Sequence, residues 1–393
     1  MRRQNIMLTV MKEQADNLRQ RSMSSKNGRC NILQVIKGRK RKNFLTFDIK
    51  SNIMEKGIKE LNLVLPEAYE AIQKSGASTN GVNGVPSGFD KLDKMTSGWQ
   101  NGELIAIGSR PAMGKTAFIL SMLKQITVNY KTPALLFSPE SSAQQVVHRM
   151  MANICEIPSE KIKSGLLADY EWQQLDYKLR DLLDAPLYID DTSSLRIEDL
   201  CEKAKESVEK YGIKIIVIDY LQLLYNEVKY CENRYLELNY FTRRLKTLAR
   251  ELNIPIIITS QLNRELEKRD GEEGKRPQLS DLRDSGTICD DCDMVCFIHR
   301  PEYYKIYTSQ DGTDLRGMAE FIIAKHRNGA VGDVRLRFIS QYARFQNPED
   351  DMIIPLPPSS TLGARMNNGN NVPPPPLTDN PFGGMGADGP LPF

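Results

Sequence analysis

Short apolar segments alternate with amphipathic ones along the central part of the chain. The apolar segments are rich in Ile, Leu and Val, as buried β-strands are, whereas the amphipathic segments repeat their apolar residues at helical spacing. Residues 235–252 follow the helical pattern, with Phe241 and Leu245 on one side. The predicted strands are LIAI (104–107), ALLF (134–137), PLYID (186–190), IKIIVID (213–219), PIIIT (255–259), MVCFI (294–298) and EFIIA (320–324).

This alternation over residues 80–347 predicts an α/β fold with a mostly parallel central sheet that helices cover on both faces. Hydrophobic residues are 40% and charged residues 26% of the 393 positions, which suits a sizeable core and excludes a wholly disordered chain. The sequence contains no run of about 18 or more apolar residues. The first residues also lack the pattern of a secretory signal, so we expect a cytoplasmic protein without a membrane span.

Three flanking segments differ from this central domain in composition. Residues 1–46 are basic and polar, and we predict a disordered arm that is either a solvated tail or binds nucleic acid. Residues 47–79 repeat apolar positions at helical spacing, with Pro66 interrupting, before a stretch rich in Gly, Ser and Asn, which predicts a broken linker helix and a flexible linker. Residues 348–393 hold 11 of the 21 prolines, which predicts a disordered tail, either passive or ending in a docking peptide.

The net charge of +3 hides an asymmetry between the arm and the rest of the chain. Residues 1–50 contain 13 Lys or Arg against 3 Asp or Glu, which leaves 40 against 47 in residues 51–393. The globular part is therefore mildly acidic. Any nucleic acid that it binds has to meet a local basic surface or loop, since the field of the whole domain does not attract phosphate.

The segment GSRPAMGKT follows a predicted strand and opens a helical segment. This context is typical of a phosphate-binding loop, in which backbone N–H groups and a helix N-terminus attract phosphate. Lys115 can reach the β- and γ-phosphate oxygens, and Thr116 can hold Mg²⁺. The usual spacing would place the first glycine at position 109, so a glycine-containing turn before a buried helix remains an alternative. The candidate nucleotide-binding residues are Gly108, Ser109, Arg110, Pro111, Ala112, Met113, Gly114, Lys115 and Thr116.

Three further polar residues end predicted strands, at the edge where ligands bind in open α/β sheets. Asp219 can hold Mg²⁺ through water, and Glu140 can take a proton from a water that attacks the γ-phosphate. The amide of Gln261 can contact both the γ-phosphate and that water. Each of the three is by itself also consistent with a helix cap or a solvated residue. Together with the phosphate loop they predict an ATPase site.

The cysteines Cys289, Cys292 and Cys296 resemble part of a metal site in their spacing. However, Cys296 lies within an apolar segment, and no second Cys/His pair with suitable spacing follows. We interpret all three as ordinary thiols. An odd total of seven scattered cysteines agrees with a reducing compartment.

Several segments together resemble the C-terminal ATPase domain of the DnaB family of hexameric replicative helicases, over about residues 80–347. The resemblance implies a RecA-like P-loop ATPase domain, and the family also lacks the first loop glycine, where this chain has Ser109. The segments that carry it are GVPSGFDKLDKMTSG, SRPAMGKTAF, IIVIDYLQLL, LARELNIPIIITSQLNRELEKR, KRPQLSDLRDSG and IIAKHRNGAVGDV.

The resemblance gives each candidate at the sheet edge a role. It implies that Lys115 and Thr116 bind phosphate and Mg²⁺. It implies further that Glu140 is the catalytic base, Asp219 the Walker B carboxylate and Gln261 the γ-phosphate sensor. ATP and Mg²⁺ are the expected cofactors.

The family also places its ATP sites between the subunits of a homohexamer. By resemblance, Lys325 and Arg327 form a K-x-R pair that reaches the γ-phosphate of the neighbouring subunit. The loop SDLRDSG resembles the family's DNA-binding loop in the central channel, which implies that Arg283, Asp284 and Gly286 contact the backbone of single-stranded DNA. Neither expectation follows from the composition or the spacing of this chain.

The resemblance implies a replicative DNA helicase motor that moves 5′ to 3′ on single-stranded DNA. Members of the family carry a helical N-terminal domain that contacts primase, and residues 1–46 do not resemble it, so contacts with primase, a helicase loader and the primosome stay open. A RecA-like recombination or repair ATPase is one alternative function. A nucleotide-dependent DNA-binding or loading factor that no longer unwinds is another.

Overall fold

The computed structural model of the chain describes residues 60–77, 81–226, 234–271, 273–282, 286–309 and 311–352. The chain forms two compact units, Met1–Val64 and Leu65–Phe393, whose boundary falls inside helix α2 (Leu61–Ala77). This helix continues past Pro66 and is not broken there, contrary to the sequence-based expectation. The predicted arm, most of the remaining linker segment and the predicted tail beyond Met352 lie outside the described residues.

A sheet of nine strands forms the centre of the second unit, in the order β3-β2-β4-β5-β1-β6-β7-β8-β9. The strands from β3 to β6 in this order pair in parallel, and β7, β8 and β9 continue the sheet in antiparallel pairing. The strands are β1 (Leu104–Ser109), β2 (Ala134–Phe137), β3 (Leu187–Asp190), β4 (Ile215–Ile218), β5 (Ile256–Gln261), β6 (Met294–His299), β7 (Met318–His326), β8 (Gly332–Ile339) and β9 (Arg344–Gln346).

The predicted α/β fold with a mostly parallel sheet is confirmed, and each of the seven predicted strands is present. Strands β8 and β9 were not predicted. In β8, buried Val334, Leu336 and Phe338 alternate with exposed Asp333 and Arg335. This period of two is typical of an antiparallel strand with one solvated face, and a search for continuous apolar runs does not detect it.

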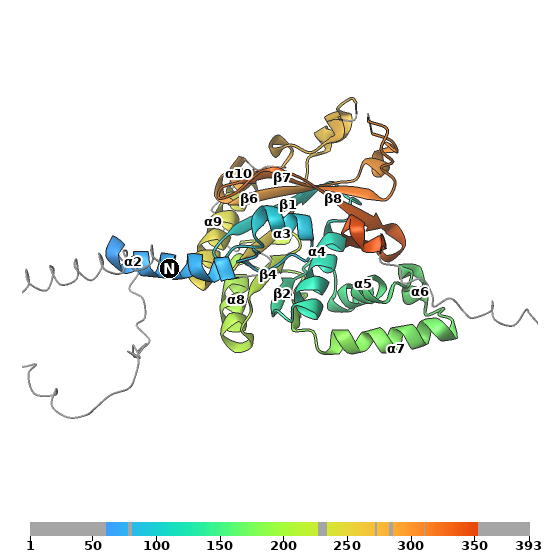
Figure 1. The fold of residues 1–393 in the computed structure, drawn as a ribbon, viewed down its shortest axis with the longest axis horizontal. Helices are drawn as coiled ribbons and strands as arrows, with labels where there is room; N and C mark the ends of the chain where they lie inside the picture. Colours follow the sequence, from blue (N-terminus) through green and yellow to red (C-terminus); the bar gives the residue numbers. More distant parts are fainter. Residues whose placement is uncertain are drawn as a thin grey trace, which may run out of the picture. The chain divides into compact units, whose positions relative to one another are not determined.

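Helices cover both faces of the sheet, as predicted (Figure 1). Alternate residues of one strand point to opposite faces, so Ile105 and Ile107 of β1 pack with α4 and α5, whereas Leu104 and Ala106 pack with α8 and α9. The helices are α3 (Asp90–Thr96), α4 (Lys115–Lys124), α5 (Ala143–Cys155), α6 (Ser159–Ser164), α7 (Asp169–Leu183), α8 (Ile197–Tyr211), α9 (Arg234–Leu252) and α10 (Gly286–Asp291).

Short helical turns occupy many of the connections. One is a π-helical turn, Gln125–Asn129, which directly follows α4. The 3₁₀ turns are η2 (Leu221–Leu223), η3 (Arg264–Lys268), η4 (Glu273–Lys275), η5 (Leu279–Asp281), η6 (Pro301–Tyr304), η7 (Ser340–Tyr342) and η8 (Pro348–Met352). Within the described part of the chain, no helix combines the length and the apolar character that a membrane span requires.

The parallel strands bring their carboxyl ends to one edge of the sheet. Register pairs Ser109 at the end of β1 with Gln261 at the end of β5, and β4 lies on the other side of β5. Ligands of open α/β sheets bind outside this edge, where loops leave the strands. The candidate residues that end β1, β4 and β5 therefore lie close together.

Candidate nucleotide-binding site

The loop between β1 and α4 has the geometry of a phosphate cradle. Gly114 precedes the first residue of α4 with a φ of 95°, in the region that favours glycine, and no side chain caps the helix. A Cβ atom at Gly114 would lie 3.1 Å from the ring of Phe345. The first N–H groups of α4 therefore have no capping partner, and they point toward the loop, where a phosphate would satisfy them.

Lys115, Thr116 and Asp219 meet beside this loop. The Thr116 hydroxyl donates to Asp219 Oδ2 at 2.7 Å, and Lys115 Nζ lies 3.7 Å from Asp219 Oδ1. Burial lowers the pKa of Lys115, against the opposing influence of the nearby carboxylates of Asp219 and Glu140. A phosphate would offer this half-desolvated ammonium a second anionic partner.

These oxygens also suit Mg²⁺. The ion prefers oxygen ligands and is usually held by one or two protein groups together with phosphates and water. The hydroxyl of Thr116 and the carboxylate of Asp219 already lie within hydrogen-bond distance of each other. The described residues contain no group of three or more His, Cys, Asp or Glu side chains that could hold a metal ion. A Mg²⁺ site here therefore depends on the phosphates of a bound nucleotide.

Glu140 and Gln261 lie at the same edge. Glu140 follows β2 and is exposed, and its charge is close enough to act on Lys115. Gln261 is half-buried at the end of β5, opposite Ser109. The structure thus brings together the phosphate loop, Asp219, Glu140 and Gln261, four features that the sequence placed at one sheet edge.

Two residues that sequence reasoning did not select also shape the site. Thr259 donates from its hydroxyl to Asp219 Oδ1 at 2.6 Å, so both carboxylate oxygens are held by threonines. The ammonium of Lys115 lies 4.4 Å from the ring centroid of Tyr220, a cation–π distance. The signal for Thr259 was available, because it is the polar residue within the apolar segment PIIIT.

The side chains of the loop differ in their surroundings. The guanidinium of Arg110 is buried, donates to Glu267 Oε1 at 2.7 and 2.9 Å, and donates to the Leu262 carbonyl at 2.8 Å. Met113 is buried in the core, whereas Pro111 is exposed. The Arg110 side chain therefore fixes the loop to the segment that follows β5, and only the backbone of this residue faces the cradle.

Lys325 and Arg327 lie at the opposite edge of the sheet. Lys325 pairs with Val295 near the start of β6, and the Arg327 N–H donates to the Asp293 carbonyl at 2.8 Å. Because a strand rises about 3.3 Å per residue, the length of β1 separates this edge from the phosphate loop by about 16 Å. The pair does not belong to the phosphate site of its own chain.

The predicted DNA-binding residues are described only in part. Arg283 and Asp284 lie outside the described residues, and Gly286 is the first residue of α10. The segment before them is anchored, since Leu282 forms a β-bridge with Leu262, the neighbour of Gln261. The three cysteines Cys289, Cys292 and Cys296 are free thiols in this structure.

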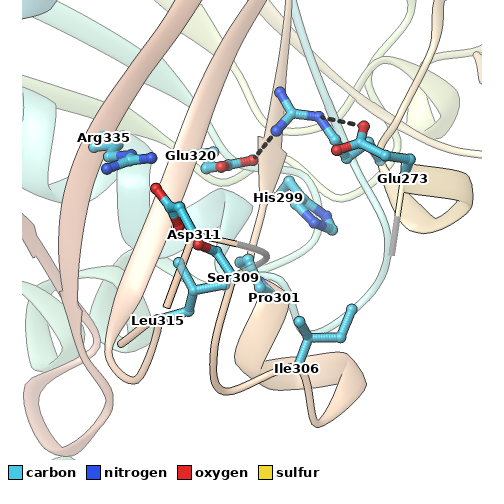
Figure 2. Close-up of a pocket in the computed structure, with 10 residues that line it drawn as sticks. Glu273, His299, Pro301, Ile306, Ser309, Asp311, Leu315, Glu320 and Arg335 are labelled. Carbon is cyan, nitrogen blue, oxygen red and sulfur yellow. Dashed lines mark hydrogen bonds and ion pairs between the residues drawn. The ribbon is translucent and has the colours of Figure 1, made fainter. Parts of the chain in front are cut away.

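A separate cavity of about 260 Å³ lies beyond the end of β6 (Figure 2). Arg276 crosses its wall and binds Glu320 Oε2 at 2.7 Å and Asp333 Oδ2 at 2.6 Å. The lining contains none of the candidate nucleotide-binding residues. It consists of Glu273, Arg276, His299, Pro301, Ile306, Ser309, Asp311, Leu315, Glu320 and Arg335.

His299 in this wall predicts a pH dependence of stability. Burial, with the nearby charge of Arg276, lowers its pKa from 6.5 to about 4. Between these values the unfolded chain binds the proton and the folded chain does not, so folding loses about 3 kcal/mol as pH falls from 6.5 to 4. We expect His299→Asn to lose less free energy of unfolding than wild type over this interval in urea titrations. His148→Asn is the matched control, and equal losses for wild type and His299→Asn would contradict the expectation.

Comparison with known proteins identifies the fold and the family. The family model described as the DnaB-like helicase C terminal domain matches residues 84–347. The chain belongs to the DnaB-like helicase family. Its RecA-like DnaB fold is shared with a solved helicase ATPase domain, at 33% identity and a TM-score of 0.68, over 74% of this chain and 99% of that one. The expectation of a RecA-like P-loop domain is confirmed.

Curated DnaB relatives agree with this assignment. The replicative DNA helicase DnaB of Geobacillus stearothermophilus is 39% identical over 291 residues, which cover 74% of this chain and 62% of the relative. The replicative DNA helicase DnaC of Bacillus subtilis is 37% identical over 295 residues, with 74% and 63% covered. A second solved DnaB-like structure, described with its interactions with primase, matches at 33% identity and a TM-score of 0.65, over 74% of this chain and 67% of that one. The chain spans somewhat less than two thirds of these curated DnaB relatives.

Proposed function

We propose that this chain is the motor of a replicative DNA helicase, which couples ATP hydrolysis to 5′-to-3′ movement on single-stranded DNA and unwinds duplex DNA. The observation that carries the proposal is the meeting of Lys115, Thr116 and Asp219 at the mouth of an uncapped helix, in a chain of the DnaB-like family. Relatives named replicative DNA helicase support the biological process. The reaction would take place in the cytoplasm.

The residues of the site have distinct tasks in this proposal. The first N–H groups of α4 and the ammonium of Lys115 bind the β- and γ-phosphates, and Thr116 and Asp219 hold Mg²⁺. The bound ion supplies charge neutralisation on the phosphates. Glu140 accepts the proton of the attacking water, and Gln261 orients that water against the γ-phosphate. No group of this set is positively charged apart from Lys115.

The transferred phosphoryl group requires more positive charge than this set provides. We propose that Lys325 and Arg327 supply it from a neighbouring subunit of a homohexameric ring. Their place at the far edge of the sheet, about 16 Å from the loop of their own chain, supports an action in trans. Closed rings bring one edge of each subunit against another edge of the next.

We propose that Arg283, Asp284 and Gly286 contact the backbone of the DNA in the channel of the ring. One arginine per subunit, repeated around a ring, can follow phosphates without reading bases. A primase partner follows from the solved relative that is described with primase. The basic residues 1–46 remain a second candidate for DNA contact.

Replacement of Arg283 tests the DNA contact. Arg283→Ala is expected to weaken binding of single-stranded DNA to a similar extent for every base composition, because a phosphate contact carries no sequence information. The slope of log affinity against log salt should also become shallower. Fluorescence anisotropy with homopolymer oligonucleotides at several salt concentrations measures both effects. Arg180→Ala on α7 is the control, and a loss confined to one base composition would count against backbone tracking.

Unwinding of forked DNA tests the proposed function itself. Wild-type protein with ATP and Mg²⁺ should separate a fork with a 5′ single-stranded tail, and Lys115→Ala should not. Native mass measurement with an ATP analogue and single-stranded DNA should give six subunits. Filaments that exchange strands would favour the recombination alternative, whereas DNA binding and ATP hydrolysis without unwinding would favour the loading factor.

A further inference from the structure

Two buried carboxylates lie at the sheet edge that carries the K-x-R pair. Asp293 precedes β6 and Glu103 precedes β1, and both are almost fully buried. Neither belongs to the phosphate site at the other edge. Buried carboxylates are costly unless they are paired or hydrogen-bonded, so their partners indicate what they do.

Asp293 holds Arg327 at two points. Its carbonyl accepts from the Arg327 N–H at 2.8 Å, and its Oδ1 lies 3.5 Å from Arg327 Nη1. The same carboxylate is fixed from behind, because Oδ2 accepts from the Leu104 N–H at 2.8 Å and from Lys246 Nζ at 2.5 Å. Asp293 thus connects the arginine to β1 and α9, two rigid elements of the core.

Glu103 holds the next residue. Its Oε1 accepts from the side-chain amide of Asn328 at 2.9 Å, while Oε2 has no hydrogen-bond partner among the described residues. Asn328 itself is exposed. The end of the β7–β8 hairpin is therefore attached on both sides of the Arg327 Cα atom, through Asp293 and through Glu103.

These contacts leave the guanidinium able to bind a second anion. The Arg327 side chain is 44% exposed. Its Nη1 faces Asp293 and its Nη2 donates to the Asp290 carbonyl. A guanidinium has five N–H donors, so the contacts within the chain leave donors for an outside phosphate. An arginine that is held in place loses less rotamer freedom when it binds.

We propose that Asp293 and Glu103 are positioning residues, which set the direction of Arg327 toward the nucleotide of the neighbouring subunit. The inference rests on the proposed action of Arg327 in trans and goes beyond it, since it assigns the precision of that contact to two residues of the core. The carboxylates touch neither nucleotide nor DNA in this arrangement. Their loss should lower turnover and leave ATP binding unchanged.

Two variants test the two attachments. Asp293→Asn removes the charge beside Arg327, and Asn328→Ala removes the amide that Glu103 holds. We expect kcat for ATP to fall about tenfold or more in Asp293→Asn and several-fold in Asn328→Ala, with KM within about twofold of wild type. Asn328 is exposed, so Asn328→Ala should fold normally even if Asp293→Asn loses stability. Asn129→Ala, which removes another exposed amide, is the matched control.

Mixed rings distinguish positioning from a general structural role. Lys115→Ala subunits lack nucleotide binding but offer an intact hairpin, so mixing them with Asp293→Asn or Asn328→Ala should restore part of the ATPase activity. Mixing either variant with Arg327→Ala should restore none, because every interface then has a defective hairpin. A structural defect of the phosphate site would show the opposite pattern.

The outcomes separate the inference from the function on which it rests. If Arg327→Ala and Lys115→Ala fail to complement in rings of confirmed mixed composition, the action in trans is wrong. If that pair complements and the two variants keep wild-type turnover, or regain it with Arg327→Ala, the positioning role is wrong. A rise in turnover would also overturn it, because the carboxylates would then restrain the arginine.

Discussion

Glu140→Gln is expected to lower ATP turnover at saturating single-stranded DNA by about 100-fold or more, the usual contribution of a general base. Glu140 follows β2 at the edge where Lys115 and Asp219 meet, and it is exposed toward solvent. Glutamine has nearly the same shape but cannot accept the proton of the attacking water at neutral pH. ATP affinity should change little, because binding relies on the loop N–H groups, Lys115 and Mg²⁺.

Equilibrium binding of a fluorescent ATP analogue and steady-state phosphate release measure the two quantities separately. Glu160→Gln, on the exposed surface of α6, is the matched control for the loss of one carboxylate. Turnover near the wild-type value would show that Glu140 does not act in the chemical step. A large loss of ATP affinity would place its effect in binding.

The second large effect is expected for Arg327→Ala, whose turnover should fall by about 10³-fold or more, as for other arginines that stabilise phosphoryl transfer from a neighbouring subunit. The protein should still bind ATP and assemble, because the arginine lies at the edge opposite the phosphate loop. Phosphate release and native mass measurement with an ATP analogue test these expectations.

Mixing Arg327→Ala with Lys115→Ala tests the action in trans directly. At equal amounts and random assembly, an intact loop meets an intact hairpin at about one interface in four, so activity should return to at most about a quarter of wild type. Each variant alone should stay nearly inactive. Activity that never exceeds the sum of the two variants, in rings confirmed as mixed by mass, would place Arg327 in its own subunit's site or outside catalysis.

The apolar segments predicted the parallel part of the sheet because burial on both faces leaves a continuous run of Ile, Leu and Val, as in β4. The same physics hid β8, whose solvated face carries Asp333 and Arg335. The end of β7 also extends beyond the predicted EFIIA through Lys325 and His326, since polar residues at an edge do not interrupt a strand. Composition along the chain therefore reports burial more directly than it reports pairing.

The candidate site was predictable where a side chain ends a buried strand, as Asp219 does. Its supporting contacts were not. Thr259 binds Asp219 from a strand forty residues farther along the chain, and Glu267 binds Arg110 across an even greater separation. Such contacts depend on which strands become neighbours, a property of the sheet order that no local pattern contains.

The last strand of the sheet has a consequence for the synthesis of the protein. Phe345 of β9 lies against Gly114, and its N–H donates to the Ser121 hydroxyl of α4 at 2.9 Å. The helix that presents the phosphate loop is thus completed by a residue made more than two hundred positions later. A nascent chain should remain unable to bind ATP tightly until about residue 347 has left the ribosome, since strands form stable contacts only when their partners are present. ATP would then bind only after the whole domain has been translated, so incomplete chains would not compete for nucleotide.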